Sequence, residues 1–123
     1  MLLRNNLYTV KGSSRSDEGF DYLIGLNADS FIYKAHFPGQ PITPGVCIIQ
    51  IAQELYELET AHVLSISKIK NVKFLSVMIP EKNNSFVCQF RKISETVESV
   101  KFQVTVTSEE ITFAKMSLIC KQV

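Results

Sequence analysis

Apolar and polar residues alternate along the second half of the chain, as they do in strands with one buried face. The clearest run covers residues 100–106, where Val100, Phe102, Val104 and Val106 alternate with polar side chains. Strands are predicted at residues 69–77, 86–91, 100–106 and 111–120, with a short hairpin turn at 108–110. This part of the chain therefore predicts an antiparallel meander.

The first thirty residues predict two further strands. Residues 7–10 form a short run of mainly apolar side chains, and residues 20–26 alternate between large apolar side chains and polar or small ones. The stretch between them, residues 11–19, is rich in serine and glycine and is predicted to be a turn or mobile loop. Strands are thus expected on both sides of the segment that follows.

Residues 44–58 follow a helical period instead. Thr43 is a suitable N-cap, and Pro44 suits the first turn, where its missing N–H is not needed. Apolar residues cover most of the helix circumference and leave a narrow polar stripe of Gln50, Gln53, Glu54 and Glu57. A helix this apolar must be covered on several sides, which a sheet curled around it achieves.

The composition predicts one domain with one core, spanning residues 1–123. Hydrophobic residues make up 46% of the chain, and the formal net charge of +1 is too balanced for a protein that binds nucleic acid electrostatically. The apolar part of residues 1–6 is too short for a signal peptide, and the longest apolar run, residues 46–49, is too short to span a membrane. We therefore expect a soluble, cytoplasmic protein.

The three cysteines are isolated in the sequence. Cys47, Cys88 and Cys120 have no CxxC spacing, so a zinc site or a dithiol redox motif is unsupported. Their apolar surroundings favour buried, reduced thiols. The sequence also lacks a nucleotide-binding motif, and we expect neither a metal nor another cofactor.

One stretch concentrates the residues that stiffen a loop. Residues 36–46, His-Phe-Pro-Gly-Gln-Pro-Ile-Thr-Pro-Gly-Val, contain three of the four prolines and two of the five glycines. Because the helical pattern begins at its end, this loop delivers His36 to the start of a helix. Imidazole titrates near neutral pH, and free N–H groups at a helix start favour negative charge. The histidine is therefore a candidate general base, with a structural role as the alternative.

This stretch resembles the loop of the beta-hydroxyacyl-acyl-carrier-protein dehydratases. Residues 36–46 match that family's His-Phe-Pro-Gly-x-Pro-x-x-Pro-Gly-Val pattern at every fixed position, and residues 69–74 with Pro80 are similar to its strand after the helix. The resemblance covers nearly the whole chain and implies an α+β hot-dog fold, an antiparallel sheet wrapped around one central helix. It also implies a homodimer or larger hot-dog assembly with active sites between subunits.

The resemblance further implies roles for single residues. His36 would act as the base on a 3-hydroxyacyl thioester, while the N–H groups of Gly45 and Val46 hold the thioester carbonyl. The family places a glutamate where this chain has Gln50, and many of its members have glutamine where this chain has Glu54. Relative to the family, the glutamate and the glutamine have thus changed places along the helix, at positions 54 and 50.

The exchange leaves three outcomes open. His36 could serve as base and then as acid while Gln50 holds the leaving hydroxyl. Glu54, one turn further along the same helix face, could supply the acid. The chain could also bind acyl thioesters without dehydrating them. For Glu54 itself, a place in the solvated polar stripe is the favoured interpretation.

An apolar tunnel for the acyl chain is also implied by the resemblance. The candidate lining residues are Phe37, Ile49, Val72, Phe74 and Phe86, most of which would equally serve as ordinary core. Positive charge at Lys68, Lys70, Lys73, Arg91 and Lys92 would either dock an acidic acyl carrier protein or form solvated strand faces.

The leading hypothesis from the sequence is a 3-hydroxyacyl thioester dehydratase, a hydro-lyase of fatty acid or related lipid or polyene biosynthesis. One alternative is a hot-dog thioesterase, which needs a carboxylate to activate water and has Glu54 as its candidate. The other alternative is a non-catalytic subunit that binds acyl thioesters and pairs with a homologue.

Overall fold

The computed structural model describes residues 2–36, 38–109 and 111–123. Within these residues the elements run in the order β1 (Tyr8–Ser16), β2 (Gly19–Leu26), α1 (Phe31–Ala35), α2 (Gly45–Thr60), β3 (Leu64–Phe74), β4 (Ser85–Glu95), β5 (Ser99–Ser108) and β6 (Ile111–Gln122). The six strands form one antiparallel sheet with the spatial order β1-β2-β4-β5-β6-β3.

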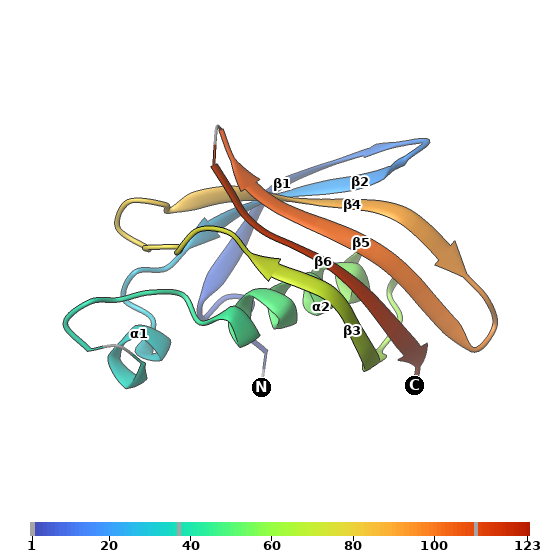
Figure 1. Cartoon of the computed structure of the whole chain (residues 1–123), viewed down its shortest axis with the longest axis horizontal. Helices are drawn as coiled ribbons and strands as arrows, with labels where there is room; N and C mark the ends of the chain where they lie inside the picture. The colour runs from blue at the N-terminus through green and yellow to red at the C-terminus, as the bar shows by residue number, and fades with distance from the viewer. Residues whose placement is uncertain (1, 37, 110) are drawn as a thin grey trace.

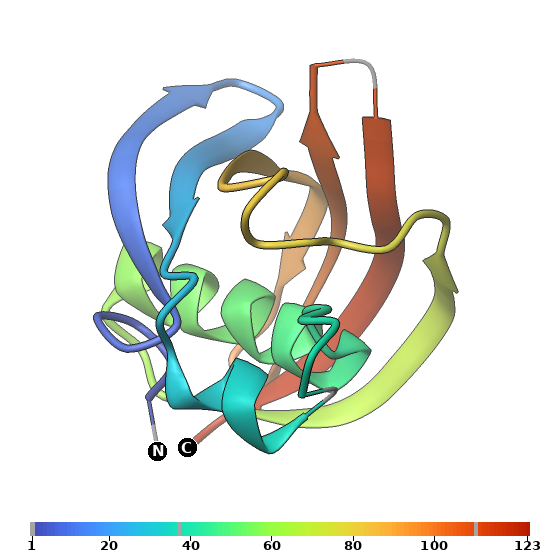
Figure 2. The same ribbon diagram turned by 90° about the vertical axis from the view of Figure 1, so that its left-hand side faces the viewer.

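The sheet curls around helix α2, which lies along its concave face (Figure 1, Figure 2). Alternate side chains of β4 and β5, including the fully buried Phe90 and Phe102, belong to the same core cluster as Ile51 and Leu55 of the helix. Tyr56 of α2 stacks on Phe102 with ring centroids 4.2 Å apart. The predicted α+β hot-dog fold is confirmed.

Strand β1 is longer than predicted. It extends to Ser16, so most of the stretch predicted as a loop, residues 11–19, is strand. Pairing with β2 explains this difference, because Ser13 lies opposite Tyr22 and Arg15 lies opposite Phe20. β1 is also an edge of the sheet, where polar side chains can point to solvent.

The start of helix α2 also differs from the prediction. Pro44 takes the N-cap position, and the helix runs from Gly45 to Thr60. Thr43 is not the cap, because its hydroxyl bonds to the hydroxyl of Tyr33 at 2.8 Å and its backbone N–H donates to the carbonyl of Met78 at 2.8 Å. The loop before the helix is therefore attached to two other segments.

Smaller differences concern α1, β3 and the last hairpin. α1 was not predicted; it begins after Ser30, whose side chain accepts a hydrogen bond from the N–H of Ile32. β3 begins earlier than predicted and ends at Phe74. In the predicted hairpin turn at 108–110, Glu110 lies outside the described residues, and Ser108 pairs with Ile111 on either side of it.

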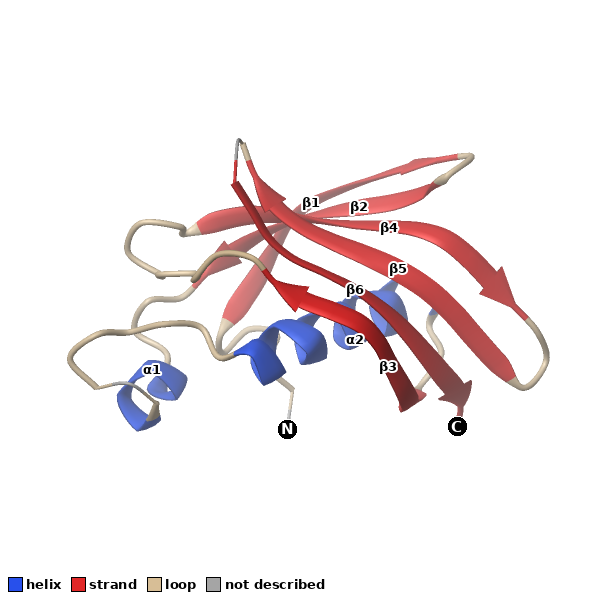
Figure 3. Cartoon of the chain, viewed as in Figure 1, coloured by secondary structure: helices blue, strands red, loops and turns tan. Residues whose placement is uncertain are grey.

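The three cysteines are free and buried, as the sequence predicted. Figure 3 shows α1 and the loop that follows it at one end of the molecule, beside the first turn of α2. Neither helix in the described part of the chain is long and apolar enough to cross a membrane.

Candidate active site

His36 lies directly after α1, at the beginning of the proline-rich loop. Its backbone N–H donates to the carbonyl of Ile32 at 2.9 Å and its backbone is extended, so the chain leaves the helix at this residue. The side chain is exposed. Thr43 anchors the other end of the loop, and the position of His36 relative to α2 is therefore fixed from both sides. Phe37, a predicted tunnel residue, lies outside the described residues.

A cleft of about 480 Å³ lies between His36, the first turn of α2 and the segment after β3. Its walls are mainly apolar and include Ile42, Pro44, Val46, Ile48, Phe74, Val77 and Met78. Gly45 and Val46 belong to the first turn of α2, where N–H groups have no acceptor within the helix. The cleft thus combines an imidazole with the positive end of a helix dipole in an apolar setting.

The ring of Phe74 packs against the start of α2. A Cβ atom on Gly45 would lie 2.7 Å from Cζ of this ring. The absent side chain of Gly45 therefore makes room for Phe74. Phe74 is 49% exposed and Val46 is 71% exposed, so the outer wall of the cleft is open apolar surface.

Gln50 and Glu54 line a separate hollow of about 200 Å³. None of the described residues that line it also lines the cleft at His36. A single chain therefore brings His36 together with Gly45, Val46 and Phe74, but not with Gln50 or Glu54.

Glu54 is buried, with 5% of its surface exposed, and this corrects the prediction that it lies in a solvated stripe. Its carboxylate accepts hydrogen bonds from the backbone N–H groups of Leu3 at 2.8 Å and Arg4 at 3.0 Å. The hydroxyl of Tyr8 donates to it at 2.9 Å, and Nε2 of Gln50 donates at 2.8 Å. The N-terminal segment covers Glu54, so the helical pattern alone could not reveal its burial.

The hydroxyl of Tyr8 stays protonated beside Glu54. Burial and the carboxylate of Glu54 raise the pKa of Tyr8 well above its usual value, so its hydroxyl remains a donor. Nε2 of Gln50 donates to Oε2 of Glu54, so the nitrogen of this amide lies toward the carboxylate. Glu54 therefore helps to orient the Gln50 amide.

The other two residues of the polar stripe hold the start of β3. Nε2 of Gln53 donates to the carbonyl of Leu64 at 2.9 Å, and the N–H of Leu64 donates to Glu57 at 2.7 Å. The polar side of α2 is therefore a row of attachment points for other segments.

The remaining tunnel candidates do not gather at His36. Phe86 is fully buried in the core, Ile49 is partly buried against it, and Val72 is exposed on β3. Of the predicted tunnel residues that the structure describes, Phe74 alone lines the cleft. Ile42, Val77 and Met78 also line the cleft and were not predicted to do so, although apolar residues within the loop and after β3 were a usable signal.

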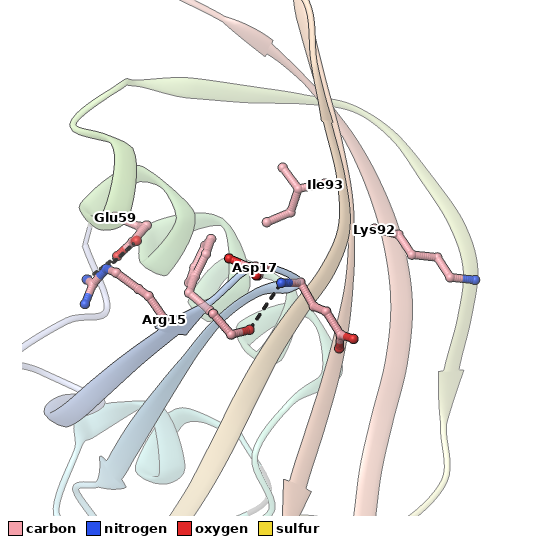
Figure 4. Close-up of a pocket in the computed structure, with 9 residues that line it drawn as sticks. Arg15, Asp17, Glu59, Lys92 and Ile93 are labelled. Atoms are coloured by element: carbon pink, nitrogen blue, oxygen red, sulfur yellow. Dashed lines mark hydrogen bonds and ion pairs between the residues drawn. The ribbon is translucent and has the colours of Figure 1, made fainter.

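A cavity of about 530 Å³ lies at the other end of α2, between the β1–β2 turn and β4 (Figure 4). Arg15 forms an ion pair with Glu59 there, and the hydroxyl of Tyr22 donates to the same carboxylate at 2.8 Å. Burial opposes ionisation of Glu59, but the hydrogen bonds from Arg15 and Tyr22 outweigh it and lower the pKa of Glu59. Lys92 points away from this pair (Figure 4). These contacts attach the β1–β2 hairpin to the helix and are structural.

Comparisons with known proteins agree with the fold. The sequence matches the family model described as ApeI-like, ApeI dehydratase, over residues 13–116. A comparison with curated proteins finds no match. One similar solved structure is the dehydratase heterocomplex ApeI:P from Xenorhabdus doucetiae, with a TM-score of 0.71 and 19% identity over 91% of this chain and 96% of that chain.

Two other solved structures share the fold. An uncharacterized protein from Erwinia carotovora subsp. atroseptica has a TM-score of 0.58 and 19% identity over 94% of this chain and 92% of that chain. A thioesterase from Haemophilus influenzae has a TM-score of 0.67 and 11% identity over 97% of this chain and 80% of that chain. At these identities the structures show a common fold. The family model covers most of the chain, and the chain therefore belongs to the ApeI-like dehydratase family.

Proposed function

We propose that the protein dehydrates 3-hydroxyacyl thioesters to 2-enoyl thioesters and water, in cytoplasmic fatty acid or related lipid or polyene biosynthesis. The observation that carries the proposal is the apolar cleft shared by His36 and the first turn of α2. This cleft offers a base and two N–H donors to one thioester. An acyl carrier protein is the proposed carrier of the acyl group.

The reaction follows from these groups. The imidazole of His36 removes the proton from the carbon next to the thioester carbonyl, and the electron pair moves toward the carbonyl oxygen. The N–H groups of Gly45 and Val46 stabilise that oxygen as it becomes negative. When the pair returns, the double bond forms and the bond to the 3-hydroxyl breaks. The leaving hydroxide takes the proton from His36 and departs as water, so no net proton is consumed.

Gln50 is proposed to act from a second chain. Within one chain it lines a different hollow from His36. Its amide can hold a hydroxyl but cannot deliver a proton as a carboxylic acid does. We propose that two hot-dog chains assemble so that Gln50 of one chain steadies the leaving hydroxyl above His36 of the other. Loss of a separate acid costs about 10²–10⁴-fold in rate, which predicts a slow enzyme.

The two histidines of the chain provide a matched test of the proposal. Hydration of a crotonyl thioester, the reverse reaction, is measured for wild type, His36→Ala and His62→Ala. His62 is exposed and follows α2, and it does not line the cleft. We expect His36→Ala to lose at least about 10²-fold in rate, and His62→Ala to match wild type. An unchanged rate in His36→Ala would end the enzymatic proposal.

The thioesterase alternative is tested in the same assay. That reaction needs a carboxylate to activate water, and the described residues that line the cleft include none. The carboxylate of Glu54 already accepts hydrogen bonds from the backbone N–H groups of Leu3 and Arg4. Release of free thiol without enoyl or hydroxyacyl product would favour hydrolysis over dehydration.

A second candidate function is that of one subunit in a heteromeric dehydratase. The lack of a carboxylate among the described residues that line the cleft favours it, because a different hot-dog chain could supply the missing acid. The similar ApeI:P structure is a heterocomplex. Activity that appears only when such a homologue is co-expressed would support this role, whereas an active purified homodimer would argue against it.

A further inference from the structure

Positive charge gathers on three neighbouring strands of the sheet. β5, β6 and β3 lie side by side, and their sequences contain six lysines and no aspartate or glutamate. These lysines, called the lysine face below, are Lys68, Lys70, Lys73, Lys101, Lys115 and Lys121. The 12 acidic residues of the chain all lie in other segments, so a net charge of +1 conceals a strong separation of charge.

The pairing register places the lysine face on the side of the sheet that points away from α2. Lys73 lies directly opposite Lys115, and Lys68 and Lys101 flank Ile119 from its two sides. The residues of β6 that alternate with these positions are buried in the core. All but one of the six lysines are exposed. The six ammonium groups therefore share one open surface.

This arrangement costs stability within the chain. Like charges directly opposite each other on paired strands repel, as Lys73 and Lys115 do. Between the described residues, the ion pairs are Arg15–Glu59 and Arg91–Asp21, and neither reaches this surface. Both lysines line a hollow of about 300 Å³ together with the polar residues Asn71, Gln103, Thr105 and Ser117. The face thus presents donors and positive charge outward.

Two residues that the sequence predicted to contribute positive charge do not lie on the lysine face. Arg91 lies on β4 and pairs with Asp21 at 2.7 Å. Lys92 lines the cavity between the β1–β2 turn and β4. Lys101, Lys115 and Lys121 take their place, because β6 pairs with β3 and β5 lies on the other side of β6.

We propose that the lysine face docks the acidic surface of a partner protein. Lys115 and Lys121 are six residues apart on one strand, which is about 20 Å, and three adjacent strands span about 10 Å. A single phosphate is far smaller than this area, whereas an acidic face of a protein matches it. Opposite charge over such an area steers association and fixes the orientation of the partner.

Other occupants fit the lysine face less well. A second copy of the same face would set lysine against lysine. Nucleic-acid surfaces use arginine to read bases and aromatic rings to stack on them, and the outward positions of these strands carry neither. An acidic protein therefore agrees best with the charge and the side chains present.

The identification of this partner as the acidic carrier of the acyl thioester rests on the proposed function. Lys73 directly precedes Phe74, whose ring lines the cleft at His36. A carrier bound to the lysine face is therefore held next to the edge of that cleft. Docking there would raise the local concentration of the thioester without adding a contact to the acyl group.

Binding of a purified acyl carrier protein, with its phosphopantetheine arm but without an acyl group, tests the inference. Titration calorimetry compares wild type with Lys101→Glu/Lys115→Glu and with the control Lys11→Glu/Lys82→Glu, whose lysines are exposed elsewhere. We expect the dissociation constant to rise at least about tenfold for the lysine-face variant, to stay unchanged for the control, and to rise with salt for wild type. Equal binding by both variants, or no binding by wild type, overturns the inference.

Two further measurements separate this inference from its competitors. If wild type binds phosphatidylglycerol vesicles but not the carrier, the face is a membrane surface and the inference fails. A crotonyl thioester of N-acetylcysteamine has no carrier to dock, so the lysine-face variant should hydrate it at the wild-type rate and lose kcat/KM only with carrier-bound substrate. If no thioester reacts but the binding difference holds, the docking inference stands and the proposed dehydratase activity fails.

Discussion

At position 54, one glutamate side chain holds four hydrogen-bond donors from the N-terminal segment, β1 and its own helix. A buried carboxylate requires such partners, because the loss of water otherwise favours its neutral form. The backbone N–H groups of Leu3 and Arg4 depend on Glu54 in turn. The contact therefore decides whether the first residues of the chain stay on the helix.

We predict that Glu54→Ala destabilises the protein by about 2–4 kcal/mol, because it leaves buried donors without an acceptor. Urea unfolding followed by circular dichroism measures the change. Glu98→Ala is the control, since Glu98 is an exposed residue between β4 and β5 and such changes stay within about 0.5 kcal/mol. Equal stability of the two variants would show that the carboxylate does not hold the N-terminal segment.

Between elements, Gly45 of α2 lies close to the ring of Phe74 of β3 at the cleft. An alanine at position 45 would suit a helix better than glycine does. Its Cβ would nevertheless meet Phe74 at 2.7 Å, so the ring must move. Because that ring is half exposed, it can turn outward, and the cost stays moderate.

We predict that Gly45→Ala costs about 1 kcal/mol in the native protein and little or nothing in a Phe74→Ala background. A double-mutant cycle by urea unfolding gives the coupling between the two positions. If Gly45→Ala costs the same in both backgrounds, some contact other than the Phe74 ring requires the glycine.

The ion pair between Arg15 and Glu59, which attaches the β1–β2 hairpin to α2, depends on pH. The pKa of Glu59 is lowered in the folded state, so its contribution to stability is present above the ordinary glutamate pKa of about 4.3 and is lost as pH falls through the lowered value. We predict that the difference in unfolding free energy between wild type and Glu59→Gln is largest at neutral pH and shrinks in acid. A difference that stays constant from neutral pH into acid would refute this role.

The elements that local patterns encode were predictable. Residues 100–106 alternate because one face of β5 is buried against α2, and the loop at 36–46 ends where a helix can begin. The strand at residues 11–16 was missed because its polar side chains lie on an edge and pairing with β2 stabilises it. The burial of Glu54 was missed because its cause lies 51 and 50 residues away, at Leu3 and Arg4.

For the whole molecule, the two edges of the sheet differ in chemistry. β1 presents mainly polar side chains, whereas β3 and the segment after it expose Ile69, Val72, Phe74, Leu75 and Val77. Apolar residues on an unpaired edge favour pairing with another strand.

We predict that the protein dimerises through β3. Ile69→Asp/Val72→Asp should be monomeric, because two carboxylates on the edge oppose pairing, whereas Thr9→Asp/Ser14→Asp on the β1 edge should remain dimeric. Size-exclusion chromatography with light scattering gives the masses. A dimeric β3 variant, or a monomeric β1 variant, would place the interface elsewhere.

The contact between Gln50 and Glu54 also limits how the sequence of this protein can change over time. Gln50→Glu alone would set two carboxylates about as close as the present 2.8 Å contact, and they would repel unless they shared a proton. Glu54→Gln alone would leave one acceptor oxygen for donors that now share two. We expect either single change to destabilise the native protein, and the double change Gln50→Glu/Glu54→Gln to cost less than the sum of the two. The two positions are therefore coupled, and we expect the protein to tolerate their joint substitution better than either single one.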